Sequence, residues 1–203
     1  QALGKIALDF NALQADLMSI SAHKIGGPNG SGALLTKPGV ALAPLIHGGG
    51  QELRRRGGTE NILGIAGFGA AASAVDLTAF GQLAVLRDSL QQRLEAMDVQ
   101  GLKIWGAGTP RLANTLCFSA PGLKSDMAVM ALDLEGVAVS AGAACSSGKV
   151  AGSKVLYGMG ASEEEASSSL RVSLGHDTTQ NDIDRFVRVW AKAYARATKR
   201  RAA

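Results

Sequence analysis

Lys24 is the residue whose surroundings point most directly to chemistry. The apolar run of residues 17–21 ends in Ser21, His23 stands directly before the lysine, and a Gly/Pro turn follows it. We expect this arrangement to hold an amine at the end of a buried strand, where loss of solvation makes a lysine able to form a Schiff base with a carbonyl group. The alternative is a lysine that merely begins a surface loop, and the short motif does not by itself exclude it.

Cys145 is a second candidate, far along the chain. Residues 140–149 surround it with alanine, glycine and serine side chains that are too small to bury it, which predicts an exposed loop with an available thiol. Lys149 could favour its thiolate electrostatically. The alternative is a cysteine that serves as a small buried hydrophobe, and this fits Cys117 better, inside the predicted strand 114–119.

Composition restricts the class of protein. A chain of 203 residues is long enough for one large domain or two small ones. Because 46% of the residues are hydrophobic but only 4% aromatic, aliphatic side chains must build the core, and 26 glycines indicate tight turns and close backbone approaches to a ligand. Two cysteines do not make a disulfide framework and suit a reducing compartment. We find no secretory signal and no apolar run long enough to span a bilayer, so we expect a soluble cytoplasmic protein without a membrane role.

The net charge of +4 includes two basic clusters. Residues 54–56, all arginine, lie in a glycine-rich loop and could face an anionic ligand or partner. Basic residues 199–201 close the last predicted helix, where cations complement the helix dipole. No aromatic residues alternate with these cations, so we do not expect a nucleic-acid partner. The histidines are far apart and no C-x-x-C occurs, so no metal site is predicted.

Alternating helices and strands predict an α/β fold. Strands are predicted at residues 17–21, 32–35, 41–46, 102–105, 114–119, 136–140 and 170–174. Helices are predicted at residues 60–80, 82–97 and 125–135, with short helices after the cysteine loop and a long helix at the end. A shift in composition at residues 80–81 predicts a domain boundary.

The last helix carries a clear periodic signal. Its apolar residues recur at steps of three and four, as is typical of a helix that packs on a core: Ile183, Phe186, Val187, Trp190 and Tyr194. Thr179 and Asp182 are a predicted capping box at its start. The stretch 67–72 fits a loose dinucleotide-binding pattern, but it falls inside a predicted helix, which favours close helix packing.

Five motifs together resemble one family. Ser-Ala-His-Lys at residues 21–24 is similar to the pyridoxal-phosphate lysine motif of the class V aminotransferases. The loop at residues 140–149 is similar to that of the NifS/IscS-like cysteine desulfurases of iron–sulfur assembly. The long stretch between Cys145 and Arg171 is as in the members with an extended active-site loop. Supporting matches occur in the family's order at residues 47–52, 58–61 and 171–175.

The resemblance implies an enzyme that uses pyridoxal 5'-phosphate and acts on L-cysteine. Lys24 would hold the cofactor and act as the base at the substrate Cα, while Ser21 and His23 would bind the cofactor phosphate. Cys145 would take the sulfur as a persulfide and leave L-alanine. A mobile loop would then carry the persulfide to a sulfur-acceptor or iron–sulfur scaffold protein.

The same resemblance implies three further contacts. Gln1 would touch the ring hydroxyl of the cofactor. Thr59 would reach the phosphate bound by the neighbouring protomer, which implies a homodimer. Arg171 would bind the substrate carboxylate with its fork of donors. Taken alone, Arg171 also fits an ordinary strand-edge cation, and Thr59 fits the cap of a helix that begins at Glu60.

The resemblance also implies the domain organisation, that of a pyridoxal-phosphate-dependent transferase of fold type I. Residues 1–80 would be the remaining part of the cofactor-binding large domain, and residues 81–203 the smaller C-terminal α/β domain with the cysteine loop. The family's aspartate at the pyridinium nitrogen and its ring-stacking histidine would lie before Gln1, so we expect roughly the C-terminal half of an enzyme, inactive in isolation. Ala143 and Gly58 depart from the family, which usually has serine at the first position and often at the second.

Two alternatives stay open at this point. In another class V aminotransferase or lyase, Cys145 would be incidental and no sulfur would be released. A non-catalytic fragment would instead dock sulfur-acceptor proteins through the Cys145 loop and the basic C-terminus.

Overall fold

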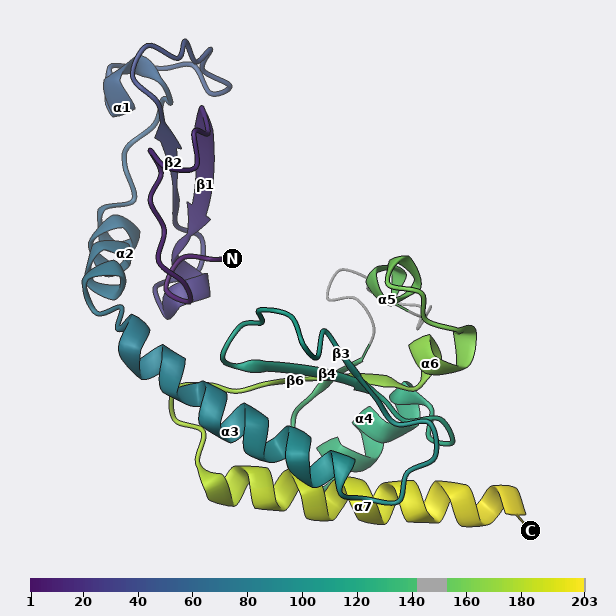
Figure 1. The fold of residues 1–203 in the computed structure, drawn as a ribbon. Helices are drawn as coiled ribbons and strands as arrows, with labels where there is room; N and C mark the ends of the chain where they lie inside the picture. Colours follow the sequence, from purple (N-terminus) through teal and green to yellow (C-terminus); the bar gives the residue numbers. More distant parts are fainter. Residues whose placement is uncertain (142–152, 203) are drawn as a thin grey trace. The chain divides into compact units, whose positions relative to one another are not determined.

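The computed structural model describes residues 1–141 and 153–202, in two compact units (Figure 1). Unit 1 is Gln1–Thr78 and unit 2 is Ala79–Ala203. The predicted boundary falls two residues later, after residue 80 rather than residue 78. The assignment of the units to the large and small domains of a longer enzyme stays a prediction.

Unit 1 is built on two antiparallel strands. β1 (Leu17–Ser21) pairs with β2 (Gly32–Thr36), and the 3-10 turn η1 (Ala22–Ile25) follows β1 directly. Both strands lie where they were predicted. The strand predicted at residues 41–46 was wrong, because this segment is irregular in the structure. Pro44 within it has no N–H to donate to a neighbouring strand.

α2 (Ile62–Ser73) packs closely on the segment after β1 because small residues line the contact. A Cβ atom added to Gly67 would lie 2.5 Å from Pro28 Cγ, and one added to Gly27 would lie 3.2 Å from Ala71 Cβ. Larger side chains have no room there. The prediction that the glycine-rich stretch serves close helix packing is confirmed.

The single helix predicted over residues 60–80 is interrupted. α2 ends at Ser73, and α3 (Leu77–Glu95) begins where the Asp76 carboxylate accepts the backbone N–H of Thr78 at 2.8 Å. An acceptor side chain just before a helix satisfies one of its free N–H groups and favours a new start. None of the described helices is by itself long and apolar enough to cross a membrane. α2 and α3, taken together as a bent pair, are long and apolar enough by length and composition alone.

α1 (Gln51–Arg54) is not an ordinary helical turn. Its residues 52–54 have φ angles of 49°, 55° and 64°, in the left-handed region that costs an L-residue about 1–2 kcal/mol. The arginine cluster at residues 54–56 lies at and after this turn with its side chains exposed. Arg55 Nη1 donates to Thr36 Oγ1 at 3.4 Å, which ties the cluster to β2.

Unit 2 contains a four-stranded antiparallel sheet. Its strands, in spatial order, are β3 (Lys103–Trp105), β4 (Thr115–Ser119), β6 (Ser169–Ser173) and β5 (Ser140–Ala141). The strand predicted at residues 136–140 is reduced to the short β5, because Val137 N–H still bonds to the Leu132 carbonyl of the preceding helix at 2.9 Å. Figure 1 shows α3, α4 (Ser125–Asp133) and α7 (Gln180–Ala202) on one side of this sheet.

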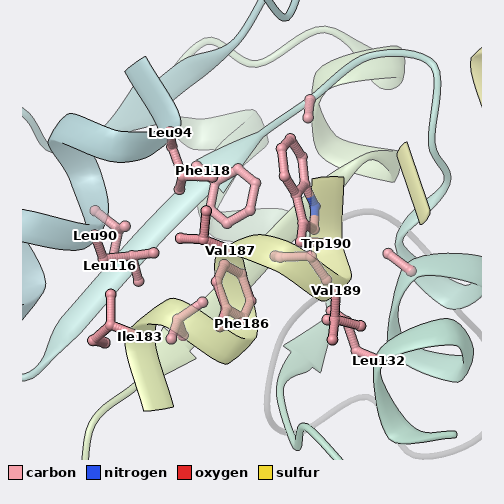
Figure 2. Close-up of a cluster of buried hydrophobic side chains, with 14 of the residues drawn as sticks. Leu90, Leu94, Leu116, Phe118, Leu132, Ile183, Phe186, Val187, Val189 and Trp190 are labelled. Carbon is pink, nitrogen blue, oxygen red and sulfur yellow. The ribbon is translucent and has the colours of Figure 1, made fainter. Parts of the chain in front are cut away.

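The side of the sheet that faces these helices builds the core of unit 2 (Figure 2). Phe118 of β4 meets Trp190 of α7 edge-to-face, with ring centroids 5.4 Å apart. The apolar face predicted for the last helix is confirmed, since four of its residues are buried: Ile183, Phe186, Val187 and Trp190.

Polar side chains form hydrogen bonds at the starts of the helices around the sheet. One Asp182 carboxylate oxygen accepts both the backbone N–H and the hydroxyl of Thr179 at 2.8 Å. The predicted capping box is thus half formed, because the Asp182 N–H donates to the Thr179 carbonyl and not to its hydroxyl. Two short helices precede β6, namely α5 (Lys154–Gly158) and α6 (Glu163–Ser167), and α6 starts with a reciprocal capping box. Short helices were predicted in this region.

Candidate active site

Lys24 lies on η1, which the fold holds in place through Ala22. Ala22 is completely buried. Its N–H donates to the Ser31 carbonyl at 3.1 Å, and its carbonyl accepts the Gly27 N–H at 2.9 Å. Gly26 has a φ of +81°, the left-handed conformation in which glycine commonly ends a helical turn. The turn is therefore anchored on its buried side.

The side chains of His23 and Lys24 are exposed on this turn. The expectation that Lys24 sits at the end of a buried strand was wrong for this chain. β1 alternates exposed and half-buried residues, because β2 is its only partner among the described strands. Within the described residues, the Ser21 hydroxyl, the His23 imidazole and the Lys24 amine make no hydrogen bond or ion pair. All three groups are free for a ligand.

Gln1 and Thr59 lie in the same unit as this turn. Gln1 is exposed. The turn that follows it packs so closely on η1 that a Cβ atom added to Gly4 would lie 2.7 Å from Ile25 Cγ2. Thr59 is exposed and does not cap a helix. The Asn61 side chain caps α2 by accepting a backbone N–H of its first turn at 3.1 Å, so the suggestion of a Thr59 cap was wrong.

Arg171 lies at the centre of the unit 2 sheet. Its cross-strand partners are Cys117 on β4 and Ser140 on β5, and Cys117 is in turn opposite Trp105 on β3. Directly opposed residues of antiparallel strands point to the same face, with Cβ atoms about 4.5–5.5 Å apart. The four residues therefore form one row across the sheet. The alternative of an ordinary strand-edge cation was wrong, because β6 is an interior strand.

A cavity of about 520 Å³ opens on the face of the sheet opposite the core. The sheet contributes Trp105, Thr115, Cys117 and Arg171, and the segment around α5 contributes Ser153, Val155, Leu156 and Met159. Within the described chain, the Arg171 guanidinium has no hydrogen-bond or ion-pair partner. It is therefore free to bind a carboxylate in this cavity.

Trp105 forms a rigid wall of the cavity. Its Nε1–H donates to Ser119 Oγ at 2.7 Å, and that hydroxyl donates to the Glu165 carbonyl at 2.7 Å. The Lys103 ammonium lies 4.0 Å from the Trp105 ring centroid and 3.0 Å from the Glu165 carboxylate. The indole is thus held by hydrogen bonds and by a cation–π contact.

Cys117 is the residue of this cavity whose position sequence reasoning missed. It lies inside β4, as predicted, but it is half-buried and lines the cavity rather than the core. Burial raises the pKa of its thiol, and the Arg171 guanidinium partly opposes this effect. Strand periodicity could have revealed the position, because Leu116 and Phe118 face the core and the residue between them must face the other way.

Several of the predicted features lie outside the described residues. These are Cys145, Ala143 and Lys149. Gly58, the other departure from the family pattern, has a φ of +92°, which glycine adopts without strain.

The profile of the class-V aminotransferases matches residues 1–186. The chain belongs to the class-V aminotransferase family. A cysteine desulfurase of Cereibacter sphaeroides is 41% identical over 189 residues, which are 93% of this chain and 49% of that protein. The structure of a NifS-like protein from Rickettsia africae matches with a TM-score of 0.84 at 35% identity, over 95% of this chain and 51% of the other.

A second similar structure is that of SspA in complex with cysteine, with a TM-score of 0.65 at 30% identity, over 86% of this chain and 48% of SspA. This chain thus spans about half the length of the relatives that it matches. The matches confirm the predicted α/β fold of pyridoxal-phosphate-dependent transferases.

Class-V aminotransferases depend on pyridoxal phosphate, and the free groups at the end of β1 and on η1 fit this cofactor. The hydroxyl of Ser21 and the imidazole of His23 can bind the oxygens of a phosphate, and the amine of Lys24 can bond to an aldehyde. The family confirms the predicted cofactor. The roles of the individual residues stay predictions.

Proposed function

We propose that this chain is part of a cysteine desulfurase, which converts L-cysteine to L-alanine and holds the sulfur as a persulfide on Cys145. Relatives that bear this name support the proposal, as does the similarity to SspA, which was solved with cysteine. The observation that carries it is the position of Arg171 on the sheet. Its neighbour across the strands is Ser140, five residues before Cys145.

Chain connectivity supports a meeting of Arg171 and Cys145. Five residues of extended chain span at most about 18 Å, so the Cys145 thiol cannot be far from Ser140. The described chain resumes at Ser153, which also lines the cavity. The length of the chain therefore allows the proposed nucleophile to reach a substrate whose carboxylate is bound by Arg171.

The proposed reaction needs a base and a nucleophile. Lys24 Nζ removes the proton from the substrate Cα. Bound pyridoxal phosphate stabilises the negative charge that this step leaves on Cα. The Cys145 thiolate forms an S–S bond to the substrate sulfur while the Cβ–S bond breaks, and Cβ keeps that electron pair and gains a proton. Lys24 Nζ then returns a proton to Cα. The products are alanine and an enzyme persulfide, and no external oxidant is required.

The two cysteines provide a matched test in the full-length enzyme. We expect Cys145→Ala to abolish the release of sulfide from L-cysteine while the visible absorbance of the bound cofactor is retained. Cys117→Ala, which also removes one thiol, should keep most of the release. If sulfide release survives Cys145→Ala, the assignment of the nucleophile is wrong and another class V activity is favoured.

Lys24→Ala tests the cofactor-binding residue without depending on turnover. After borohydride reduction of the loaded full-length enzyme, mass spectrometry should find the cofactor's mass on the peptide that contains Lys24, and Lys24→Ala should lose it. Cofactor retained covalently on another peptide would contradict the role of Lys24.

We also propose the family's homodimer, in which Thr59 reaches the phosphate of the partner's site, and a cytoplasmic sulfur-acceptor or iron–sulfur scaffold protein as the recipient of the persulfide. Mixing inactive Thr59→Ala and Lys24→Ala variants should restore part of the activity, because one site of the mixed dimer is then intact. No recovery in a verified mixed dimer would place Thr59 and Lys24 in the same protomer's site.

A further inference from the structure

We propose that Arg111 is a second carboxylate-binding residue of the cavity that holds Arg171, so that the cavity selects small carboxylates through two guanidinium groups. The proposal rests on the proposed function only in naming an amino-acid carboxylate as the natural ligand. The cavity itself is a feature of the described structure.

Arg111 is oriented from outside the cavity. Its Nη2 donates to Gln91 Oε1 at 2.7 Å, and Gln91 Nε2 donates to Glu95 Oε1 at 2.9 Å. Arg111 lines the cavity together with Arg171. Two side chains of α3 therefore fix one edge of the guanidinium and leave the other edge free.

The free edge of Arg111 lacks a partner. Its Nη1 is buried and makes no hydrogen bond within the described chain. A buried charged donor without an acceptor is unfavourable, and such groups in native proteins normally meet a ligand, an ion or a water molecule. Arg87 provides the contrast, because its nitrogens are bound by the Leu112 carbonyl and the Asp88 carboxylate.

The charges of the cavity point to an anion. The described lining residues include two arginines and no carboxylate. An anion in the cavity would be attracted by both guanidinium groups.

The rest of the cavity restricts the chemical type of this anion. Apolar side chains line it together with the Cys117 thiol: Leu112, Val155, Leu156 and Met159. A volume of about 520 Å³ admits an amino-acid carboxylate, and this lining suits one that carries an apolar or sulfur-containing group.

Cys117 makes the proposal testable without any turnover. Iodoacetate and iodoacetamide have nearly the same size and alkylate a thiolate by the same displacement of iodide, but only iodoacetate is an anion. The ratio of their rates at the Cys117 peptide, followed by mass spectrometry on the full-length enzyme, reports how strongly the cavity attracts a carboxylate.

We expect Arg111→Gln to lower the iodoacetate-to-iodoacetamide ratio about tenfold, as for the loss of one charge-assisted hydrogen bond. Lys192→Gln is the matched control, because it removes one cation of unit 2 that does not line this cavity and should change the ratio less than about twofold. Arg111→Lys should give an intermediate ratio, since it keeps the charge but loses the planar fork.

An unchanged ratio in Arg111→Gln would overturn the proposal. Equal changes in both rates would also overturn it, because they would assign Arg111 a purely structural role. If the ratio falls but the wild-type enzyme releases no sulfur from L-cysteine, the carboxylate site stands and the proposed function fails. If both hold, Arg111→Gln should raise the KM for L-cysteine about tenfold and leave kcat within about twofold.

Discussion

The two units bury their apolar side chains to very different extents. In unit 2, Phe118 and Trp190 are 0% and 1% exposed within a continuous core. Among the described residues of unit 1, the buried apolar side chains are Ala22 and Phe68, whereas Leu63 is 87% exposed. Burial of apolar surface is the dominant favourable contribution to folding, so the two units differ in their means of stabilisation.

The two residues proposed to bind substrate and cofactor, Arg171 and Lys24, are therefore held in place in different ways. Arg171 is positioned by a sheet with its own core, whereas Lys24 lies on a turn anchored by small-residue contacts with α2. We expect the exposed apolar side chains of unit 1 to need cover from further protein. The predictions below test this contrast.

The largest effect is expected when the units are separated. Residues 77–203 should unfold cooperatively in urea, with a near-ultraviolet circular dichroism signal from packed aromatic side chains, because this fragment keeps the whole core of unit 2. Residues 1–76 should show neither. A cooperative transition in the shorter fragment alone would reverse the contrast.

Single truncations should reproduce the contrast in the whole chain. Trp190→Ala should lower the free energy of unfolding by about 3–5 kcal/mol, because it empties a packed core position. Leu63→Ala should change it by less than about 0.5 kcal/mol, as for an exposed side chain. Urea denaturation measures both, and similar costs would show that Leu63 is covered.

Two glycines of α2 give a sharper test of how α2 stabilises the turn that carries Lys24. Gly67→Ala should destabilise the full-length protein by about 1–3 kcal/mol, because the new methyl group meets Pro28. Gly69→Ala, with no atom of the surroundings within 4 Å of the added Cβ, should stabilise by about 0.5–1 kcal/mol through helix propensity. Equal effects in thermal denaturation would remove Gly67 from the contact.

The smallest effect concerns pH and Cys117. Burial raises the pKa of this thiol above its ordinary value, so iodoacetamide should react with it at higher pH in the folded protein than in the denatured chain. Arg171→Gln should move the rate profile further upward, because the arginine lowers this pKa. The folded state favours the neutral thiol, so its stabilisation is present at low pH and is lost as pH rises through the raised pKa. A profile like that of the denatured chain would mean that the thiol is solvated.

Local patterns predicted much of the fold. β1, β4 and α7 lie close to their predicted positions, because alternation and three- and four-residue steps are encoded by neighbours in sequence. The left-handed turn of residues 52–54 had no local signal, because side chains of that type rarely adopt such angles.

In the candidate site, too, some features had a local sequence signal and others had none. The motif at residues 21–24 predicted the cofactor and the residues that would bind it, but the exposure of Lys24 depends on which strands cover it. Cys117 was correctly assigned to a strand, but the face of the sheet on which it lies was not predicted. The alternation of residues along the strand would have indicated that face. Arg111 carried no motif at all.

The sequence by itself determined the family, the cofactor, the main strands and the last helix, because these depend on residue types at short, fixed spacings. Strand order and packing, in contrast, place Arg171 between Cys117 and Ser140, and they bring Arg111 to the same cavity with one nitrogen unpaired within the described chain. The reason is physical: strand order and register bring together residues that are far apart along the chain, and long-range packing, not local pattern, determines them.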